Sequence, residues 1–262
     1  MDPKDFKQYS NDPRFIPGIY NFCDRWCERC SFQDRCMSYN MDKARGWEPG
    51  KTGDTSPQEV WERLKQTFDQ TRQIIESLAR EHGLEVPAAA NDAEQTEQTR
   101  VSREGARNHE LVTDARAYLK AADAWFRDEK ALFSEKGEEL MLRESMGMGG
   151  TSEEVKALKD AVEVIRWYQP FIYVKLTRAF SSRATESALS EQFPRDSDGT
   201  AKTALIAIDR SIEAWTSLRG HFPEKTDGIL DVLIQLDRIR KGTEQEFPKA
   251  RDFVRPGFDE RD

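Results

Sequence analysis

All four cysteines of this 262-residue chain lie within one short stretch, "CDRWCERCSFQDRC". They are Cys23, Cys27, Cys30 and Cys36, and their spacing is C-x3-C-x2-C-x5-C. Cysteine thiolates are the ligands of structural zinc ions and of iron–sulfur clusters. In a reducing compartment, clustered cysteines are more often metal ligands or redox groups than disulfides. We therefore predict that the four side chains converge on one metal site.

If residues 21–31 form an α-helix, the cysteine spacing sets the angles between the cysteines around the helix axis. At about 100° per residue, Cys27 would lie about 40° from Cys23, and Cys30 about 20° from Cys23 on the other side. Three thiolates would then share one helix face, and a following turn would return Cys36 as the fourth ligand.

Two metal sites fit such a segment, and free thiols are a third alternative. Structural zinc sites with four cysteines usually take their ligands as two pairs from separate knuckles, joined by a longer connection. Iron–sulfur clusters suit a compact cysteine run, because the cluster spreads its thiolate ligands apart. A 4Fe–4S cluster is the favoured cofactor, zinc is the alternative, and free redox thiols or disulfides come third.

The last three cysteines, with their C-x2-C-x5-C spacing, resemble the closing part of the 4Fe–4S loop of the endonuclease III family of DNA glycosylases. A similar run closes the cluster site of RecB-like and CRISPR-associated nucleases. The resemblance implies cluster ligation by Cys27, Cys30 and Cys36. The spacing between Cys23 and Cys27 is shorter than the first cysteine spacing in that family's loop. It does not extend to the enzymes, because the catalytic motifs of both groups are missing. The whole segment also looks like the front end of a group of uncharacterised bacterial helical proteins.

The residues between the cysteines would suit an anionic centre. Arg25, Arg29 and Arg35 stand among the ligands, while Trp26 and Phe32 could exclude water. Long charged side chains extend toward solvent, so we expect the arginines to form a basic rim. Such a rim on an acidic protein would attract an acidic protein partner.

The composition restricts the class of protein. Charged residues make up 34% of the chain and hydrophobic residues 37%, the net charge is −8 and the pI is near 5.2. An acidic chain is a poor binder of nucleic acid. No apolar run is long enough to span a membrane, and the start "MDPKDFKQYSNDPRF" is unlike a secretory signal. We expect a cytoplasmic protein with no nucleic-acid or membrane partner.

Apolar residues recur at helical spacing along the rest of the chain, and no stretch alternates as a strand does. The prediction is an all-α protein, an up-and-down bundle of about five helices. The helices are expected at about 57–82, at 101–146 with a break near Gly137, from Thr151 past Phe180, at 199–219 and at about 223–241. The expected domains are the four-cysteine metal-binding segment 1–45, the helical bundle 57–242 and an irregular C-terminal tail 243–262.

Other sites are weaker candidates. A di-iron carboxylate site is not expected, because no histidine stands three residues after a glutamate. Glu129 falls on the apolar side of its predicted helix, and we expect it to pair with a Lys or Arg. Pro170 should kink its helix. We interpret the aromatic residues around it as core, with a pocket at the kink as the alternative: Trp167, Tyr168, Phe171 and Tyr173.

These features support three functions. The first is a cluster-binding helical protein with a role in electron transfer, sensing or partner contact. The second is an adaptor whose zinc ion holds the cysteine segment in shape. The third is a cluster-dependent enzyme of unknown chemistry.

Overall fold

The computed structural model describes residues 9, 11–44, 46, 72–73, 76–77, 79–80, 92–186 and 195–259. Within these ranges every regular element is a helix and none is a strand, so the prediction of an all-α protein is confirmed. The chain divides into two compact units. The cysteine unit comprises Met1–Thr96 and Val254–Asp262, and the helical unit comprises Glu97–Phe253.

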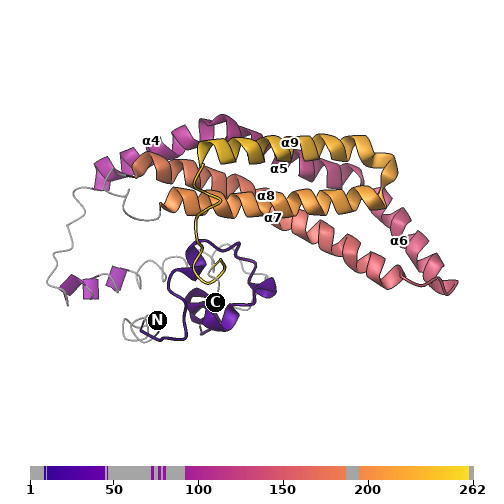
Figure 1. The fold of residues 1–262 in the computed structure, drawn as a ribbon, viewed down its shortest axis with the longest axis horizontal. Coiled ribbons are helices and arrows are strands. Elements are labelled where there is room, and N and C mark those ends of the chain that lie inside the picture. Colours follow the sequence, from indigo (N-terminus) through magenta and orange to yellow (C-terminus); the bar gives the residue numbers. More distant parts are fainter. Residues whose placement is uncertain are drawn as a thin grey trace. The chain divides into compact units, whose positions relative to one another are not determined.

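Four long helices of the helical unit pack around a common core (Figure 1). Helix α7 lies against α8, α8 lies against α9, and α5 contacts both α7 and α9. Helix α6 packs on α5 and α7, and its Phe133 ring also meets the Phe222 ring edge-to-face at 5.1 Å. The bounds are α4 (Asp92–Asn108), α5 (Glu110–Asp128), α6 (Lys130–Ser145), α7 (Thr151–Thr185), α8 (Asp196–His221), the 3-10 turn η6 (Pro223–Lys225) and α9 (Thr226–Glu246).

The centre of this core is aromatic and includes hydrogen bonds of the Tyr118 hydroxyl with Trp215 and Ser211. Tyr118 of α5 and Trp215 of α8 are both 0% exposed, and the Trp215 indole N–H donates a hydrogen bond to the Tyr118 hydroxyl at 3.1 Å. Burial is the main cause that raises the pKa of Tyr118 to about 12. Helix α8 approaches its neighbours through small buried side chains, namely Ala201, Ala204, Ala207 and Ala214.

The long helix predicted over 101–146 is three helices, and its breaks lie at His109 and Glu129 instead of near Gly137. The His109 ring accepts a hydrogen bond from the Leu111 N–H at 3.3 Å, which caps α5, and it stacks on Phe180 of α7 at 3.8 Å. Glu129 ends α5 and pairs with Lys225 at 2.8 Å. The expected pairing of Glu129 is therefore confirmed.

The other helix ends differ from the predicted ones by a few residues. Gly150, with φ +87°, caps α7 in place of Thr151, α8 begins at Asp196, and α9 continues to Glu246. Helix α7 continues through Pro170, which lies on an exposed position.

The aromatic residue nearest to Pro170 in the core is Tyr168. Its side chain is buried, and its hydroxyl accepts a hydrogen bond from Arg210 of α8. Tyr168 is therefore a core residue, as interpreted, whereas Trp167, Phe171 and Tyr173 are half-buried.

The helix predicted at about 57–82 falls almost entirely outside the described residues, so the number of five helices stays a prediction. None of the described helices combines the length and the apolar character that crossing a membrane requires.

Candidate metal centre

The cysteines occupy a chain of short turns within the cysteine unit. Cys23 follows the first 3-10 turn, Cys27 opens the second, Cys30 ends it, and Cys36 ends the third. These elements are η1 (Ile19–Asn21), η2 (Cys27–Arg29), η3 (Gln33–Arg35) and α2 (Met37–Ala44). Residues 21–31 do not form the α-helix on which the shared-face geometry depended.

Local hydrogen bonding explains why no α-helix forms there. The Asp24 carboxylate accepts a hydrogen bond from the Trp26 N–H at 3.1 Å, which gives the backbone an alternative to helical bonding. Arg25, between them, has φ +60° and is the one described non-glycine residue with positive φ. That left-handed conformation costs about 1 kcal/mol or more in a residue with a Cβ. The loop is thus held in a shape that its local sequence does not favour.

All four cysteines line a single hollow in this unit. The empty space of the hollow, including its open mouth, is about 330 Å³. Apart from the cysteines, the hollow is lined by Ile19, Tyr20, Asp24, Arg25, Trp26, Phe32, Gln33, Tyr39 and Phe258. The expectation that Trp26 and Phe32 would lie beside the thiols agrees with this lining.

The thiols surround the hollow without meeting at one point. Among the described residues, no three His, Cys, Asp or Glu side chains come together closely enough to hold one metal ion. All four cysteines are free thiols, and each is partly buried. The structure therefore brings the four residues to one hollow but does not place them around a single centre.

Backbone groups make hydrogen bonds with three of the four sulfurs. The Cys30 Sγ accepts from the Phe32 N–H at 3.4 Å, and the Cys36 Sγ accepts from the Tyr39 N–H at 3.5 Å. The Cys23 thiol donates to the Tyr20 carbonyl at 3.5 Å. The hydrogen bond from the Phe32 N–H favours the thiolate of Cys30, but burial has the larger effect on the pKa of this thiol.

Burial disfavours ionisation of two of the metal-free thiols, Cys27 and Cys30. It is the largest cause that raises the pKa of Cys27 to about 11, and the charges of the other three cysteines add to it. Burial also raises the pKa of Cys30. Reactive redox cysteines instead have a lowered pKa, because the thiolate is the nucleophile. The environment therefore argues against free redox thiols, the third alternative.

Sequence reasoning missed one wall of the hollow, which comes from residues 254–259. The Phe258 ring meets the Phe32 ring edge-to-face at 5.0 Å between centroids. Gly257 has φ +74°, and a Cβ built on it would lie 2.9 Å from the Ile16 Cδ1. Only a glycine tolerates both that φ and that close approach. No periodicity or motif near Phe258 predicted this contact.

A second missed feature is the pair of amides that holds the loop carbonyls. The Gln33 amide donates to the Cys27 carbonyl. The Asn40 amide donates to the Gln33 carbonyl at 2.8 Å and to the Cys36 carbonyl at 2.9 Å. These bonds tie the second turn, the third turn and α2 together, so the spacing of Cys27 and Cys36 does not depend on a bound metal alone.

The three arginines of the loop are exposed, and so are Glu28 and Asp34 between them. The Arg29 guanidinium lies over the Trp26 ring at 4.0 Å, and the Arg25 guanidinium reaches the Ser38 hydroxyl at 3.4 Å. Arg35 is exposed beside the last ligand.

Comparison with protein-family models, with curated proteins and with solved structures finds no match to this chain.

Proposed function

We propose that Cys23, Cys27, Cys30 and Cys36 hold a 4Fe–4S cluster. The rest of the chain is proposed to be an up-and-down bundle of about five helices. The observation that supports this proposal best is that all four thiols line one hollow.

Simple geometry relates that observation to the metal. A zinc–sulfur bond is about 2.3 Å long, so four sulfurs in a tetrahedron around one zinc ion are about 3.8 Å apart. A cluster places its ligands on four separate iron atoms and holds the sulfurs farther apart. The sulfur–sulfur separations of the loaded protein would therefore distinguish the two centres, and the compact run of the four cysteines favours the cluster.

The surroundings are suited to such a centre. When bound, the cluster would exchange single electrons at a potential that depends on hydrogen bonds to sulfur and on solvent exposure. The N–H groups of Phe32 and Tyr39 supply the hydrogen bonds, and the rings of Trp26 and Phe258 limit the access of water. This combination supports a role in electron transfer, sensing or partner contact.

The experiment is anaerobic purification with iron, sulfide and zinc analysis of the wild type and of single Cys→Ser variants. A 4Fe–4S site predicts about four iron and four sulfide per chain and a brown colour that dithionite bleaches. Cys36→Ser should lower the iron content, whereas Ser31→Ala, a change on the same loop, should leave it unaltered. A chain with neither iron nor zinc would refute both metal proposals.

The second candidate is a zinc-stabilised adaptor. Four thiolates are the ligand set of a closed structural zinc site, and all four thiols line the hollow. One zinc per colourless chain would select this function. Removal of zinc by a chelator should then loosen the loop, because zinc binding contributes directly to the folding of small sites.

The basic rim would serve the cluster protein as a contact for an acidic protein partner. Exposed charges steer association, and the effect weakens as salt rises. Reduction by such a partner should slow between low and physiological salt, and the triple change of Arg25, Arg29 and Arg35 to Gln should remove that dependence. A rate that is independent of salt in the wild type would contradict this role.

A further inference from the structure

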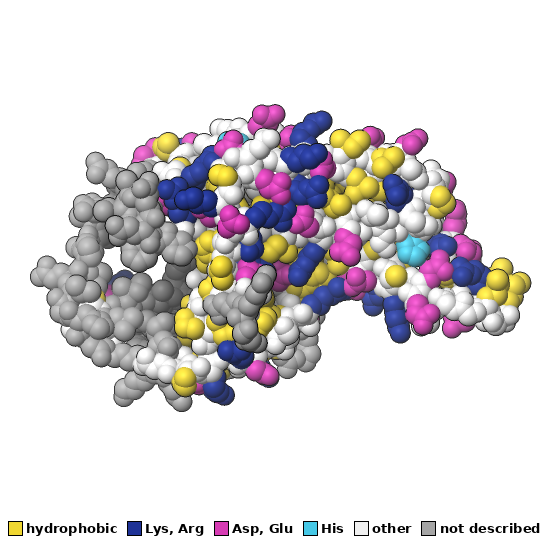
Figure 2. All heavy atoms as spheres, viewed as in Figure 1, with side chains coloured by type: hydrophobic (Ala, Val, Ile, Leu, Met, Phe, Trp, Pro, Cys, Tyr) yellow, Lys and Arg dark blue, Asp and Glu magenta, His cyan; other side chains and the backbone are white. Residues whose placement is uncertain are grey.

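The end of the hairpin formed by α6 and the first turns of α7 has an exposed apolar surface. Hydrophobic side chains gather at this end of the helical unit (Figure 2). Five large apolar residues there are between 46% and 73% exposed, and they form the group called here the hairpin tip: Met141, Leu142, Met146, Met148 and Val155.

The tip is not an unpacked part of the core. Leu140, the residue before Met141 in α6, is only 3% exposed, so its side chain is packed in the core while those of the tip are not. The side chains of the tip belong to the outer side and to the connection 146–150. Together they expose on the order of 500 Å² of apolar surface, which is near the upper end of what a monomer presents as one patch. A patch of that size marks an interaction site more often than chance exposure does.

Ion pairs hold the hairpin in a defined shape. Glu154 of α7 binds Lys136 at 3.1 Å and Arg143 at 2.8 Å, both from α6. Lys136 also binds Glu139 at 3.0 Å. These pairs lower the pKa of Glu154, chiefly through the hydrogen bond from Lys136. The tip is thus presented by two helices that are already joined.

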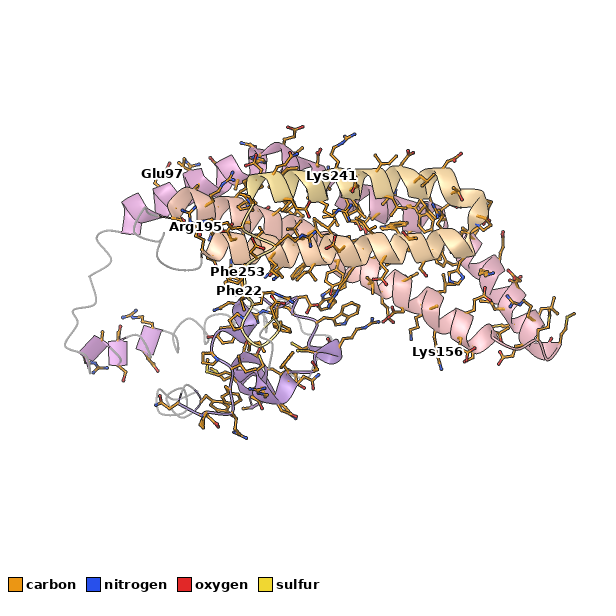
Figure 3. All side chains as sticks on the ribbon, viewed as in Figure 1. Phe22, Glu97, Lys156, Arg195, Lys241 and Phe253 are labelled. Carbon is orange, nitrogen blue, oxygen red and sulfur yellow. The ribbon has the colours of Figure 1, made fainter. Side chains whose placement is uncertain are left out.

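Lys136 and Arg143 are both paired with Glu154 within the hairpin, whereas three acidic side chains near the tip take no part in these pairs. Glu138, Glu144 and Glu153 are exposed, and within the described part of the chain they make no ion pair. Lys156 is an exposed cation on α7, and its side chain is labelled in Figure 3. The rim of the apolar tip is therefore predominantly acidic.

We propose that the hairpin tip docks a basic amphipathic helix of a partner protein. The flexible thioether side chains of Met141, Met146 and Met148 adapt to an irregular apolar helix face. The acidic rim would pair with lysines or arginines that flank that face.

Two other occupants fit the charges less well. An anionic membrane surface would repel Glu138, Glu144 and Glu153. A second copy of this chain, related by a two-fold axis, would bring the same three acids toward themselves.

The probe is a fluorescent synthetic peptide of leucine and lysine at helical spacing, about 18 residues long because shorter helices are marginal in water. A peptide of the same composition in scrambled order is its control. Fluorescence anisotropy should show that the patterned peptide binds the full chain and that the scrambled one binds more weakly. The triple variant Met141→Ser, Met146→Ser, Met148→Ser should weaken binding by about tenfold or more, which corresponds to about 1.4 kcal/mol.

Matched variants on other surfaces control for general apolar exposure. Val174 and Ile234 are 57% and 58% exposed and lie outside the hairpin tip, so Val174→Ser and Ile234→Ser should leave the affinity unchanged. A separate variant with Gln at Glu138, Glu144 and Glu153 should weaken binding at low salt and reduce its salt dependence. The substituted side chains are exposed, and circular dichroism should confirm that every variant keeps its helix content.

Three results would overturn the proposal. The first is equal peptide affinity in the wild type and both tip variants. The second is sedimentation with vesicles of anionic phospholipid that the Met→Ser changes abolish, which would assign the tip to a membrane. The third is a concentration-dependent dimer in ultracentrifugation that the same changes dissociate, which would assign the tip to a second copy of the chain.

Discussion

Phe258 offers a direct test of how the hollow around the cysteines is closed. Its ring lines the hollow and meets Phe32 edge-to-face at 5.0 Å. Arg255 of the same segment lies over the Phe258 ring at 4.9 Å and pairs with Asp259 at 2.9 Å. We predict that Phe258→Ala opens the hollow to solvent without unfolding the helical unit.

The magnitude follows from the contacts that are lost. An edge-to-face ring pair contributes about 1 kcal/mol, and half-burial of a Phe side chain contributes about another 1 kcal/mol. Weakening the segment by about 2 kcal/mol should raise the population of its open state by about 30-fold. The thiols should react faster by up to the same factor, because reagent reaches them through that open state.

The assay uses reduced, metal-free protein and an aromatic disulfide reagent that releases a coloured thiolate. Stopped-flow absorbance gives the rate for each group of thiols. Val254→Ala is the matched control, because Val254 lies in the same segment and is 58% exposed. It should react at the rate of the wild type. Because no metal is present, the result does not depend on whether the site holds a cluster or zinc.

One result would refute the reasoning: equal thiol rates in Phe258→Ala and the wild type. The ring would then contribute nothing to closure of the hollow. A rate increase accompanied by loss of the circular-dichroism helix signal would also refute it, since the effect would be global unfolding.

Four further predictions concern the fold and the thiols. A Cβ at Gly242 would overlap the Leu111 side chain, so Gly242→Ala should lower the unfolding free energy by about 1–2 kcal/mol in urea denaturation, because overpacking outweighs the gain in helix propensity. Gly137→Ala, with no heavy atom within 4 Å of the new Cβ, should raise it by up to about 1 kcal/mol; the same sign for both would contradict this packing. The pKa of Tyr118, raised from 10.0 to about 12, stabilises the fold below pH 10, and this contribution should be lost as the pH rises through 12; Tyr118→Phe should remove that part of the pH dependence in chemical denaturation. Because the pKa of Cys27 is raised from 9.0 to about 11, metal loading near pH 7 should release protons into an indicator dye, and no release would mean that the thiols are already ionised. Replacing all four cysteines with Ser should retain most of the helix signal, because the core of the helical unit contains none of them; wholesale loss of that signal would contradict independent folding.

The sequence alone was enough to predict features that depend on residues close together in the chain. The four cysteines are close in the chain, so short turns bring them to one hollow even though the helix expected over 21–31 does not form. Apolar periodicity predicted the all-α class, because the spacing of side chains along a helix is a local property. A basic partner for Glu129 could be predicted because an unpaired buried acid is costly, and the structure shows that this partner is Lys225.

The tertiary structure decided features that depend on residues far apart in sequence. The break at His109 is stabilised by stacking on Phe180, and no pattern near position 109 encodes that ring. Phe258 closes the hollow against Phe32 from the other end of the sequence, and Gly257 permits the approach to Ile16. Such contacts arise only when the chain has folded, because each requires two separate surfaces to be complementary in shape.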